Sequence, residues 1–342
     1  MKDILSQLAK WRGKGETIAM ATVVQTWGSS PRGVGAKMGI TAQGNMTGSV
    51  SGGCVEGAVI EVGMQVLHTH QPQLLHFGVA DETAWGVGLA CGGTIEVFVQ
   101  PLDGQLFEPL RAAIENEQPA ASVTVIRGPD DLLGRELIWI EGKDFSNLID
   151  SKLREEAIQA ARSALSEGQS RRTTLPGGQV EVFTDVILPS STIIIIGGVH
   201  ISIALAKLAK VLGYRTVIVD PRRAFGSPER FSHADHLIQA WPDEALNSLH
   251  LSQSCAVAVL THDPKLDDPA LIAALSSPAY YVGALGSKST QAKRRARLLE
   301  AGLSKTQVDR LHGPIGLDIG ANNPEEIALS ILAEIVAARG RP

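Results

Sequence analysis

The stretch TIIIIGGVHISIALAKLAKVLGYRTVIVDPR, residues 192–222, decides the fold. It consists of a continuous aliphatic run, a glycine turn, a helical segment, a second aliphatic run and an acidic residue, Asp220. A strand that is apolar on both faces is typical of a parallel sheet covered by helices on each side. The same alternation continues downstream, with predicted strands at 256–260 and 280–283 and predicted helices at 267–275, 288–300 and 324–338. We therefore predict α/β architecture with a doubly wound parallel sheet over residues 191–342.

The glycine turn departs from the pattern that binds a dinucleotide. In a Rossmann unit, the first glycine allows the tight turn, the second admits the pyrophosphate and the third lets helix and strand pack closely. Gly197 is the first glycine here, and Gly198 follows it. The second and third positions carry Val199 and Ser202. Asp220 lies where an acid would bind the ribose, or else it caps the following loop with Arg222 and Arg223. The sequence predicts a Rossmann-like carboxyl-terminal domain and gives only weak support to NAD(P).

Two further turns follow strands at the carboxyl edge of the predicted sheet, where ligands bind in open α/β folds. His262 and Asp263 follow one strand, and Gly286, Ser287 and Lys288 follow the next and open a helix. The N–H groups of a helix N-terminus and a lysine together suit a phosphate. The same residues are also explained if Ser287 is a simple helix cap. Both interpretations stay open for this turn.

A second glycine-rich stretch, GSVSGGCVEGAVIEV at 48–62, sets Cys54 where a turn becomes a helix. Unpaired N–H groups and the helix dipole favour a thiolate at such a position. Gly52 and Gly53 are expected to leave their backbone amides open to a ligand. Glu56 either accepts the thiol proton or compensates the helix dipole. Cys91, in GVGLACGGTIEVFV at 86–99, has a similar setting, and we expect the two sulfurs to lie close together.

Length and composition set the domain count and the class of partner. A chain of 342 residues exceeds what one core normally organises, so we expect two domains, with 1–190 forming an α+β domain around a core at about 10–101. A net charge of −5 and an aromatic content of 4% argue against nucleic acid as a partner. The longest aliphatic run spans residues 193–196, far below the roughly 20 residues of a membrane span. Three cysteines and no signal-type segment indicate the cytoplasm.

Six stretches are similar to a known family: GSSPRGVGAKM (28–38), GSVSGGCVEGAV (48–59), CGGTIEVFVQP (91–101), VLTHD (259–263), YVGALGSK (281–288) and PIGLDIGANNPEEIALSILAEIVAAR (314–339). The chain resembles the XdhC/CoxI family, accessory proteins that mature molybdenum hydroxylases such as xanthine dehydrogenase. The resemblance implies a chaperone that holds the molybdenum cofactor as cargo, protects it while a terminal oxo ligand is exchanged for sulfide, and delivers it to the apo-hydroxylase. A cysteine desulfurase would supply the sulfur.

The cofactor that this resemblance implies carries a phosphate and a soft, dithiolene-bound metal, which suits anion-binding turns and thiolates. On this basis Cys54 would ligate molybdenum or carry a persulfide, Arg32 and Lys37 would meet the phosphate, and His200 is either a ligand contact or a helix-start residue. The site is expected in the cleft between the domains. Enzymatic turnover and a homodimer are left open.

Two alternatives from other classes remain. The first is an NAD(P)-dependent oxidoreductase that uses the carboxyl-terminal domain, which Val199 and Ser202 oppose. The second is a redox sensor in which Cys54 and Cys91 form a reversible disulfide, and Cys255 is expected to be a core residue. Two histidine pairs, His68 with His70 and His233 with His236, lack the company of cysteine or carboxylate that a zinc site needs.

Overall fold

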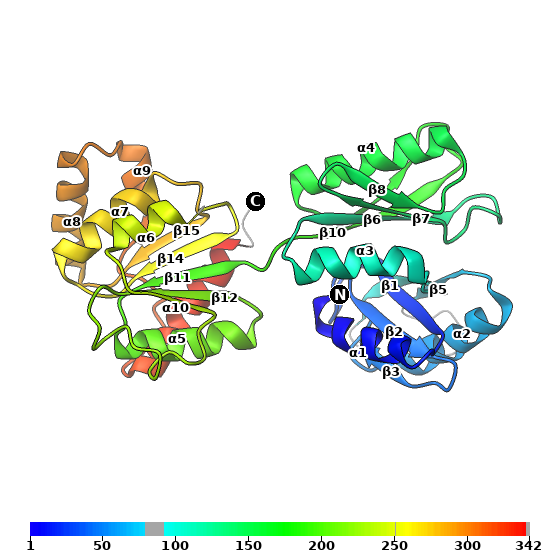
Figure 1. The fold of residues 1–342 in the computed structure, drawn as a ribbon, viewed down its shortest axis with the longest axis horizontal. Coiled ribbons are helices and arrows are strands. Elements are labelled where there is room, and N and C mark those ends of the chain that lie inside the picture. Colours follow the sequence, from blue (N-terminus) through cyan, green and yellow to red (C-terminus); the bar gives the residue numbers. More distant parts are fainter. Residues whose placement is uncertain (79–91, 250, 340–342) are drawn as a thin grey trace. The chain divides into compact units, whose positions relative to one another are not determined.

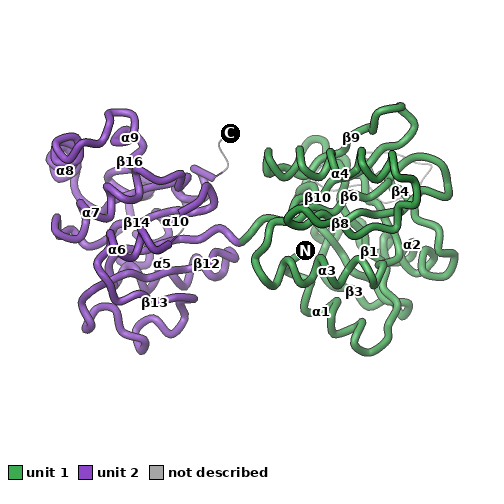
Figure 2. The backbone as a smooth tube through the Cα atoms, turned by 45° about the horizontal axis from the view of Figure 1, so that its top comes forward, with its two compact units in different colours: residues 1–189 green, residues 190–342 purple. Residues whose placement is uncertain are grey.

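The computed structural model of the chain describes residues 1–78, 92–249 and 251–339. These residues fold as two compact units, Met1–Pro189 and Ser190–Pro342 (Figure 1, Figure 2). Every helix in the described ranges is too short or too polar to cross a lipid bilayer.

The first unit begins with an antiparallel sheet, whose strand order is β3-β2-β1-β5-β4. Apolar residues alternate along β1, so that Ala19, Ala21 and Val23 face helix α2 while Ile18 and Met20 face the opposite side. This period of two is what an antiparallel strand with two covered faces requires. The elements are α1 (Lys2–Gly13), β1 (Ile18–Trp27), β2 (Lys37–Thr41), β3 (Met46–Gly48), α2 (Glu56–Thr69), β4 (Gln73–Phe77) and β5 (Thr94–Pro101).

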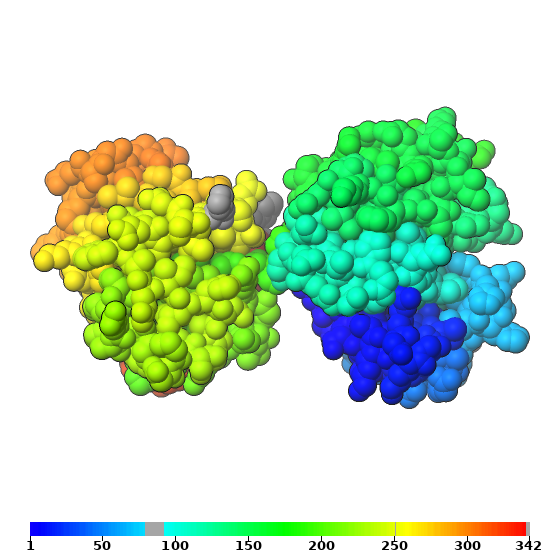
Figure 3. All heavy atoms as spheres, viewed as in Figure 1, coloured from blue at the N-terminus to red at the C-terminus, as the bar shows by residue number. Residues whose placement is uncertain are grey.

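A second antiparallel sheet, of order β8-β7-β6-β10-β9, completes this unit. Val24, Phe98, Ile126 and Phe183 join the two sheets face to face. Helix α4 covers the outer face of the second sheet, and α3 packs with α1, which it adjoins in the space-filling view (Figure 3). The elements are α3 (Gly104–Glu115), β6 (Ala120–Arg127), β7 (Glu136–Ile140), β8 (Lys143–Ser146), α4 (Ser151–Glu167), β9 (Arg171–Thr174) and β10 (Glu181–Ile187).

The second unit contains one parallel sheet of order β13-β12-β11-β14-β15-β16. Helices α5 and α10 cover one face and α6 to α9 cover the other (Figure 1). Its strands are β11 (Thr192–Ile196), β12 (Arg215–Val219), β13 (His236–Ile238), β14 (Cys255–Val259), β15 (Tyr281–Ala284) and β16 (Leu311–His312). Its helices are α5 (His200–Val211), α6 (Pro242–Ser248), α7 (Pro264–Leu275), α8 (Lys288–Glu300), α9 (Lys305–Asp309) and α10 (Pro324–Arg339). The predicted fold class is confirmed.

Candidate functional site

The loop that carries Cys54 folds around a carboxylate from its own chain. The side chain of Glu56, the first residue of α2, turns back into the loop and is 6% exposed. Its two oxygens accept hydrogen bonds from the hydroxyl groups of Ser49 (2.6 Å) and Ser51 (2.5 Å) and from the backbone N–H groups of Val50 (3.2 Å), Ser51 (2.9 Å), Gly52 (3.1 Å) and Gly53 (2.8 Å). The amides of Gly52 and Gly53, expected to face a ligand, therefore donate to Glu56 instead.

These contacts fix the charge of Glu56. Burial acts to raise its pKa, but the hydrogen bonds from Ser49 and Ser51 outweigh burial and lower the pKa to about 2. A carboxylate this weakly basic is a poor proton acceptor near neutral pH. The geometry favours the second interpretation of Glu56, in which its charge compensates the N-terminus of α2 and organises the loop.

Cys54 lies just outside the helix. We expected the helix to begin near residue 54, but it begins at Glu56, after the N-cap residue Val55, whose φ of −118° is not helical. Gly52 (φ 83°) and Gly53 (φ 123°) form the turn that precedes it. The N–H group of Cys54 donates to the hydroxyl of Ser51 at 3.0 Å. Its side chain is half-buried and its thiol is free. Among the residues that the structure describes, a Cβ built on Gly53 would meet no atom within 4 Å.

Three glycine-rich turns meet around this loop. The guanidinium Nε of Arg32 donates to the carbonyl of Ser49 at 3.2 Å, and its Nη2 lies 3.5 Å from Asp3. A Cβ on Gly52 would lie 3.5 Å from Pro31, and one on Gly28 would lie 3.5 Å from Gly93. The turns at 28–35, 49–55 and 92–93 are therefore in contact. Cys91 lies outside the described residues, so its predicted approach to Cys54 stays a prediction.

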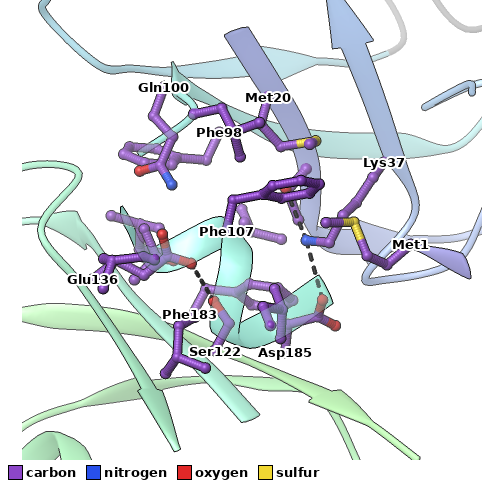
Figure 4. Close-up of a pocket in the computed structure, with 18 residues that line it drawn as sticks. Met1, Met20, Lys37, Phe98, Gln100, Phe107, Ser122, Glu136, Phe183 and Asp185 are labelled. Atoms are coloured by element: carbon purple, nitrogen blue, oxygen red, sulfur yellow. Dashed lines mark hydrogen bonds and ion pairs between the residues drawn. The ribbon is translucent and has the colours of Figure 1, made fainter. Parts of the chain in front are cut away.

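Lys37 belongs to a different place in the unit. Its side chain is 10% exposed, and its Nζ lies 3.0 Å from Asp185 and donates to the Thr22 hydroxyl at 3.1 Å (Figure 4). These groups line a cavity of about 40 Å³ between the two sheets. Glu136 also lines it, accepts a hydrogen bond from Ser122, and has its pKa raised by burial. The expected phosphate contact of Lys37 does not fit this geometry, because its charge is already matched by Asp185.

In the second unit, residues of the loop after β12 contact the glycine turn that follows β11. The Asp220 carboxylate is fully buried and accepts hydrogen bonds from the N–H of Gly198 at 2.7 Å and from the Arg222 guanidinium at 2.7 and 2.9 Å. Burial acts to raise the pKa of Asp220, but Arg222 and Gly198 outweigh it and lower the pKa. Gly198 packs directly on the backbone carbonyl of Phe225. Asp220, the acid that would bind a ribose, is thus already hydrogen-bonded to Arg222. The loop after β12 packs on the glycine turn that a pyrophosphate would approach.

The carboxyl edge of the parallel sheet gathers the other predicted residues of this unit. Strands β11, β14 and β15 are adjacent and parallel, so the turns that follow them lie at one edge. His200 and Lys288 are exposed and each begins a helix. Asp263 and Ser287 both cap helices, because Asp263 accepts from the Lys265 N–H at 3.0 Å and Ser287 from the Thr290 N–H at 3.2 Å. Ser287 therefore caps α8, and the phosphate interpretation of this turn stays a prediction.

His262 is the unusual residue at this edge. Its φ of 63° is left-handed, which is uncommon for a residue other than glycine. Its side chain is exposed. Backbone strain of this kind is often found at ligand-binding sites, and it persists only where neighbouring contacts fix it.

With the geometry established, comparisons with known proteins identify the family. The model of the XdhC and CoxI family matches residues 11–78, and that of the XdhC Rossmann domain matches residues 193–335. A Bacillus subtilis protein named as a probable xanthine dehydrogenase subunit is 31% identical to the chain over 333 residues, covering 95% of this chain and 94% of that protein. The chain belongs to the XdhC/CoxI family. The family interpretation made from the six sequence stretches is confirmed.

Other relatives cover the chain equally well. It is 25% identical to "Molybdenum cofactor insertion chaperone PaoD" of Escherichia coli, across 95% of this chain and 84% of that protein. A crystal structure described as a xanthine dehydrogenase from Bacillus halodurans superposes with a TM-score of 0.78 at 26% identity, covering 99% of this chain and 96% of that one. The XdhC/CoxI match at 11–78 includes the Cys54 loop, and the Rossmann match at 193–335 includes the carboxyl edge.

The sequence analysis did not predict the polar side chains that bond to Glu56 in the Cys54 loop and to Asp220 in the second unit. Ser49 and Ser51 organise the Cys54 loop, and Arg222 neutralises Asp220. The spacing of hydroxyl residues ahead of a glutamate was a usable signal for the first, since serine before a helix commonly bonds to the helix start. Arg222, two residues after Asp220, was named only as part of a loop cap. The composite site in a cleft between the domains stays a prediction.

Proposed function

We propose that this chain binds the molybdenum cofactor, protects it during sulfuration, and delivers it to an apo-hydroxylase of the xanthine dehydrogenase type. The observation that carries the proposal is the match, over 95% of the chain, to a protein named as a molybdenum cofactor insertion chaperone. The identity of 31% to a protein named as part of a xanthine dehydrogenase supports a hydroxylase client. A cysteine desulfurase is the sulfur-supplying partner in this scheme.

The chemistry of the cargo assigns roles to the residues. Cys54, whose thiol is free and half-buried, would ligate molybdenum or carry sulfur. Arg32, whose side chain is 39% exposed, would meet the phosphate from the neighbouring turn. In the second unit, His200, His262 and Lys288 are exposed at the edge where ligands bind in open α/β sheets.

Contacts in the second unit oppose the nicotinamide alternative. A dinucleotide in the standard pose needs the acid at the end of the second strand for its ribose and the glycine turn for its pyrophosphate. Asp220 pairs with Arg222, and Gly198 packs on Phe225. Titration with NADH, followed by its fluorescence, is expected to show no saturable binding, and tight binding would favour the oxidoreductase.

The first experiment is anaerobic purification from a molybdenum-replete host, followed by assay for molybdenum and pterin. Co-purification of both in fixed ratio supports the proposal. Protein that carries neither, and takes up neither when supplied with free cofactor, contradicts it.

The second experiment tests the thiol. Cys54→Ala is expected to abolish activation of the apo-hydroxylase in a mixture with cofactor and desulfurase, while changing stability by less than about 1 kcal/mol. Cys255→Ala is the matched control, because Cys255 is 7% exposed in the core of the second unit and its loss should cost about 1 to 2 kcal/mol without affecting the chemistry. Full activation by a well-folded Cys54→Ala variant would show that the thiol has no role.

A further inference from the structure

A buried ion pair lies beneath the carboxyl edge of the second unit. Asp267 on α7 and Arg294 on α8 have side chains that are each 1% exposed, and their nearest atoms, Oδ2 and Nη2, are 2.7 Å apart. Burial raises the pKa of Asp267, against the lowering effect of the Thr261 hydroxyl and the Arg294 guanidinium. Apolar side chains of similar volume commonly replace such a pair without loss of stability. The burial of this pair is therefore weak evidence for a role in stability.

The aspartate end of the pair holds the turn that contains His262. The hydroxyl of Thr261, the residue before His262, donates to Asp267. The N–H of Asp263, the residue after it, donates to the same hydroxyl at 3.4 Å. Thr261 is thus bonded directly to Asp267, and Asp263 is linked to Asp267 through the Thr261 hydroxyl. This arrangement accounts for the left-handed backbone of His262, which needs contacts of this kind to persist.

The arginine end holds the next turn along the edge. The Arg294 guanidinium donates to the carbonyl of Leu285 at 3.0 Å and to the side-chain oxygen of Gln291 at 2.8 Å. Gln291 in turn donates to the carbonyl of Ala284 at 2.8 Å. Ala284 and Leu285 lead directly into Gly286 and the start of α8 at Lys288.

A third turn rests on the same network. The methyl group of Thr261 packs on Gly197, where any side chain would collide with it. One connected set of side chains therefore spans the turns after β11, β14 and β15.

We propose that Asp267 and Arg294 are positioning residues, which set the turns bearing His262 and Lys288 at the separation that an anionic, phosphate-bearing cofactor requires. The proposal rests on the proposed function for the identity of that ligand. Neither side chain reaches the surface, so both act through the turns. Preorganised contacts of this kind matter because small displacements of binding groups weaken binding strongly.

The test compares two ion pairs on the same two helices. Asp268 and Arg297 also join α7 to α8, with Oδ2 and Nε 2.6 Å apart, but this pair is partly exposed and the protein contacts that it makes do not include the edge turns. The double variant Asp267→Leu/Arg294→Met removes the buried pair, and Asp268→Leu/Arg297→Met is the matched control. Two milder variants, Thr261→Val and Thr261→Ser, remove or keep the hydroxyl that links Asp267 to the turn.

Two measurements are made on the full chain. The first is equilibrium binding of molybdenum cofactor released anaerobically from a purified molybdenum enzyme. Binding is expected to weaken about tenfold or more in the buried-pair variant and in Thr261→Val, and to stay at the wild-type level in the control. Thr261→Ser should bind more tightly than Thr261→Val, because it keeps the hydroxyl that donates to Asp267 and loses only the methyl group that packs on Gly197. The second is amide hydrogen exchange, which should become faster at 261–263 and 284–287 in the buried-pair variant and in Thr261→Val while the melting temperature stays near that of the wild type.

The outcomes separate this proposal from the proposed function. A folded buried-pair variant that binds cofactor as tightly as the wild type overturns the positioning role. If that variant does not fold, Thr261→Val takes its place, and wild-type cofactor affinity in folded Thr261→Val overturns the positioning role. If wild-type protein binds no cofactor, the proposed function fails. Hydrogen exchange then tests the positioning role by itself. Unchanged exchange at 261–263 and 284–287 in the buried-pair variant would overturn that role.

Discussion

At the scale of single residues, Glu56 shows how an anion site can be filled by its own chain. Successive N–H groups in a glycine-rich turn form a concave donor set that suits an anion. Here the carboxylate of Glu56 occupies that set, together with two serine hydroxyls. A ligand that approaches Cys54 would therefore meet a loop whose N–H groups already donate to Glu56. A negative charge on such a ligand would have to be balanced by other groups, such as Arg32.

Replacing Glu56 by Gln is expected to destabilise the first unit by about 2 kcal/mol, because an amide nitrogen cannot accept the hydrogen bonds that one carboxylate oxygen receives. Urea unfolding measures the change. Glu61→Gln, an exposed substitution on the same helix, is the control and should leave the midpoint unchanged. Equal midpoints for the two variants would contradict the role assigned to Glu56.

The lowered pKa of Glu56 also predicts how the stability difference between wild type and Glu56→Gln changes with pH. The folded-state pKa of Glu56 is about 2, below its ordinary value of 4.5, so the ionised form stabilises the fold. That contribution is complete above about pH 4.5 and is lost as the pH falls through about 2. The stability difference between wild type and Glu56→Gln should therefore be largest above pH 4.5 and should shrink toward pH 2. A difference that is constant over this range would exclude the charge as its cause.

At the scale of elements, local pattern predicted most of the fold. The continuous apolar run at 193–196 became β11, and the predicted strands at 256–260 and 280–283 became β14 and β15. Short elements such as β8, β13 and α9 carry too little periodicity to be recognised, because packing from distant segments stabilises them. Long-range pairing also explains why Lys37 was misplaced. Its partner Asp185 comes from β10, in a sheet that no local signal connects to β2.

Strand β15 offers a test of tight packing. A Cβ on Gly283 would lie 2.6 Å from the Tyr281 hydroxyl and 2.7 Å from Ile315. That hydroxyl donates to Glu334 at 2.6 Å, and Glu334 also contacts His312 at 2.9 Å. Gly283→Ala should therefore lower stability by about 1 to 3 kcal/mol, through overpacking and disturbance of this cluster. Thermal unfolding measures it, and a variant as stable as the wild type would show that Tyr281 moves aside freely.

In helix α2, a glycine-to-alanine substitution is expected to raise stability instead of lowering it. Gly57 lies in the helix with an exposed position and no atom within 4 Å of a built Cβ. Gly57→Ala should raise stability by about 0.5 to 1 kcal/mol, because alanine loses less backbone freedom in a helix than glycine does. The comparison with Gly283→Ala in one unfolding series separates backbone propensity from packing. Destabilisation by Gly57→Ala would show that the added methyl group disturbs packing at this helix start and would contradict the prediction.

At the scale of the whole molecule, the chain divides into two units with separate cores. No member of the first unit appears in the two hydrophobic clusters of the second, as far as the described residues extend. Each unit carries its own candidate residues, with Cys54 and Arg32 in the first and His262 and Lys288 in the second. A cofactor with a phosphate at one end and a metal at the other has the chemistry to engage both.

The composite-site prediction can be tested by separating the units between Pro189 and Ser190. The fragments 1–189 and 190–342 should each show one cooperative thermal transition, since each has its own core. If the site is shared, each fragment should bind molybdenum cofactor far more weakly than the intact chain, because covalent linkage turns the second contact into an intramolecular one and commonly strengthens binding about a hundredfold or more. Cys54→Ala should then weaken binding to the intact chain and to the fragment 1–189, the two proteins that contain this residue. A fragment that binds as tightly as the whole chain would assign the entire site to one unit and end the composite model.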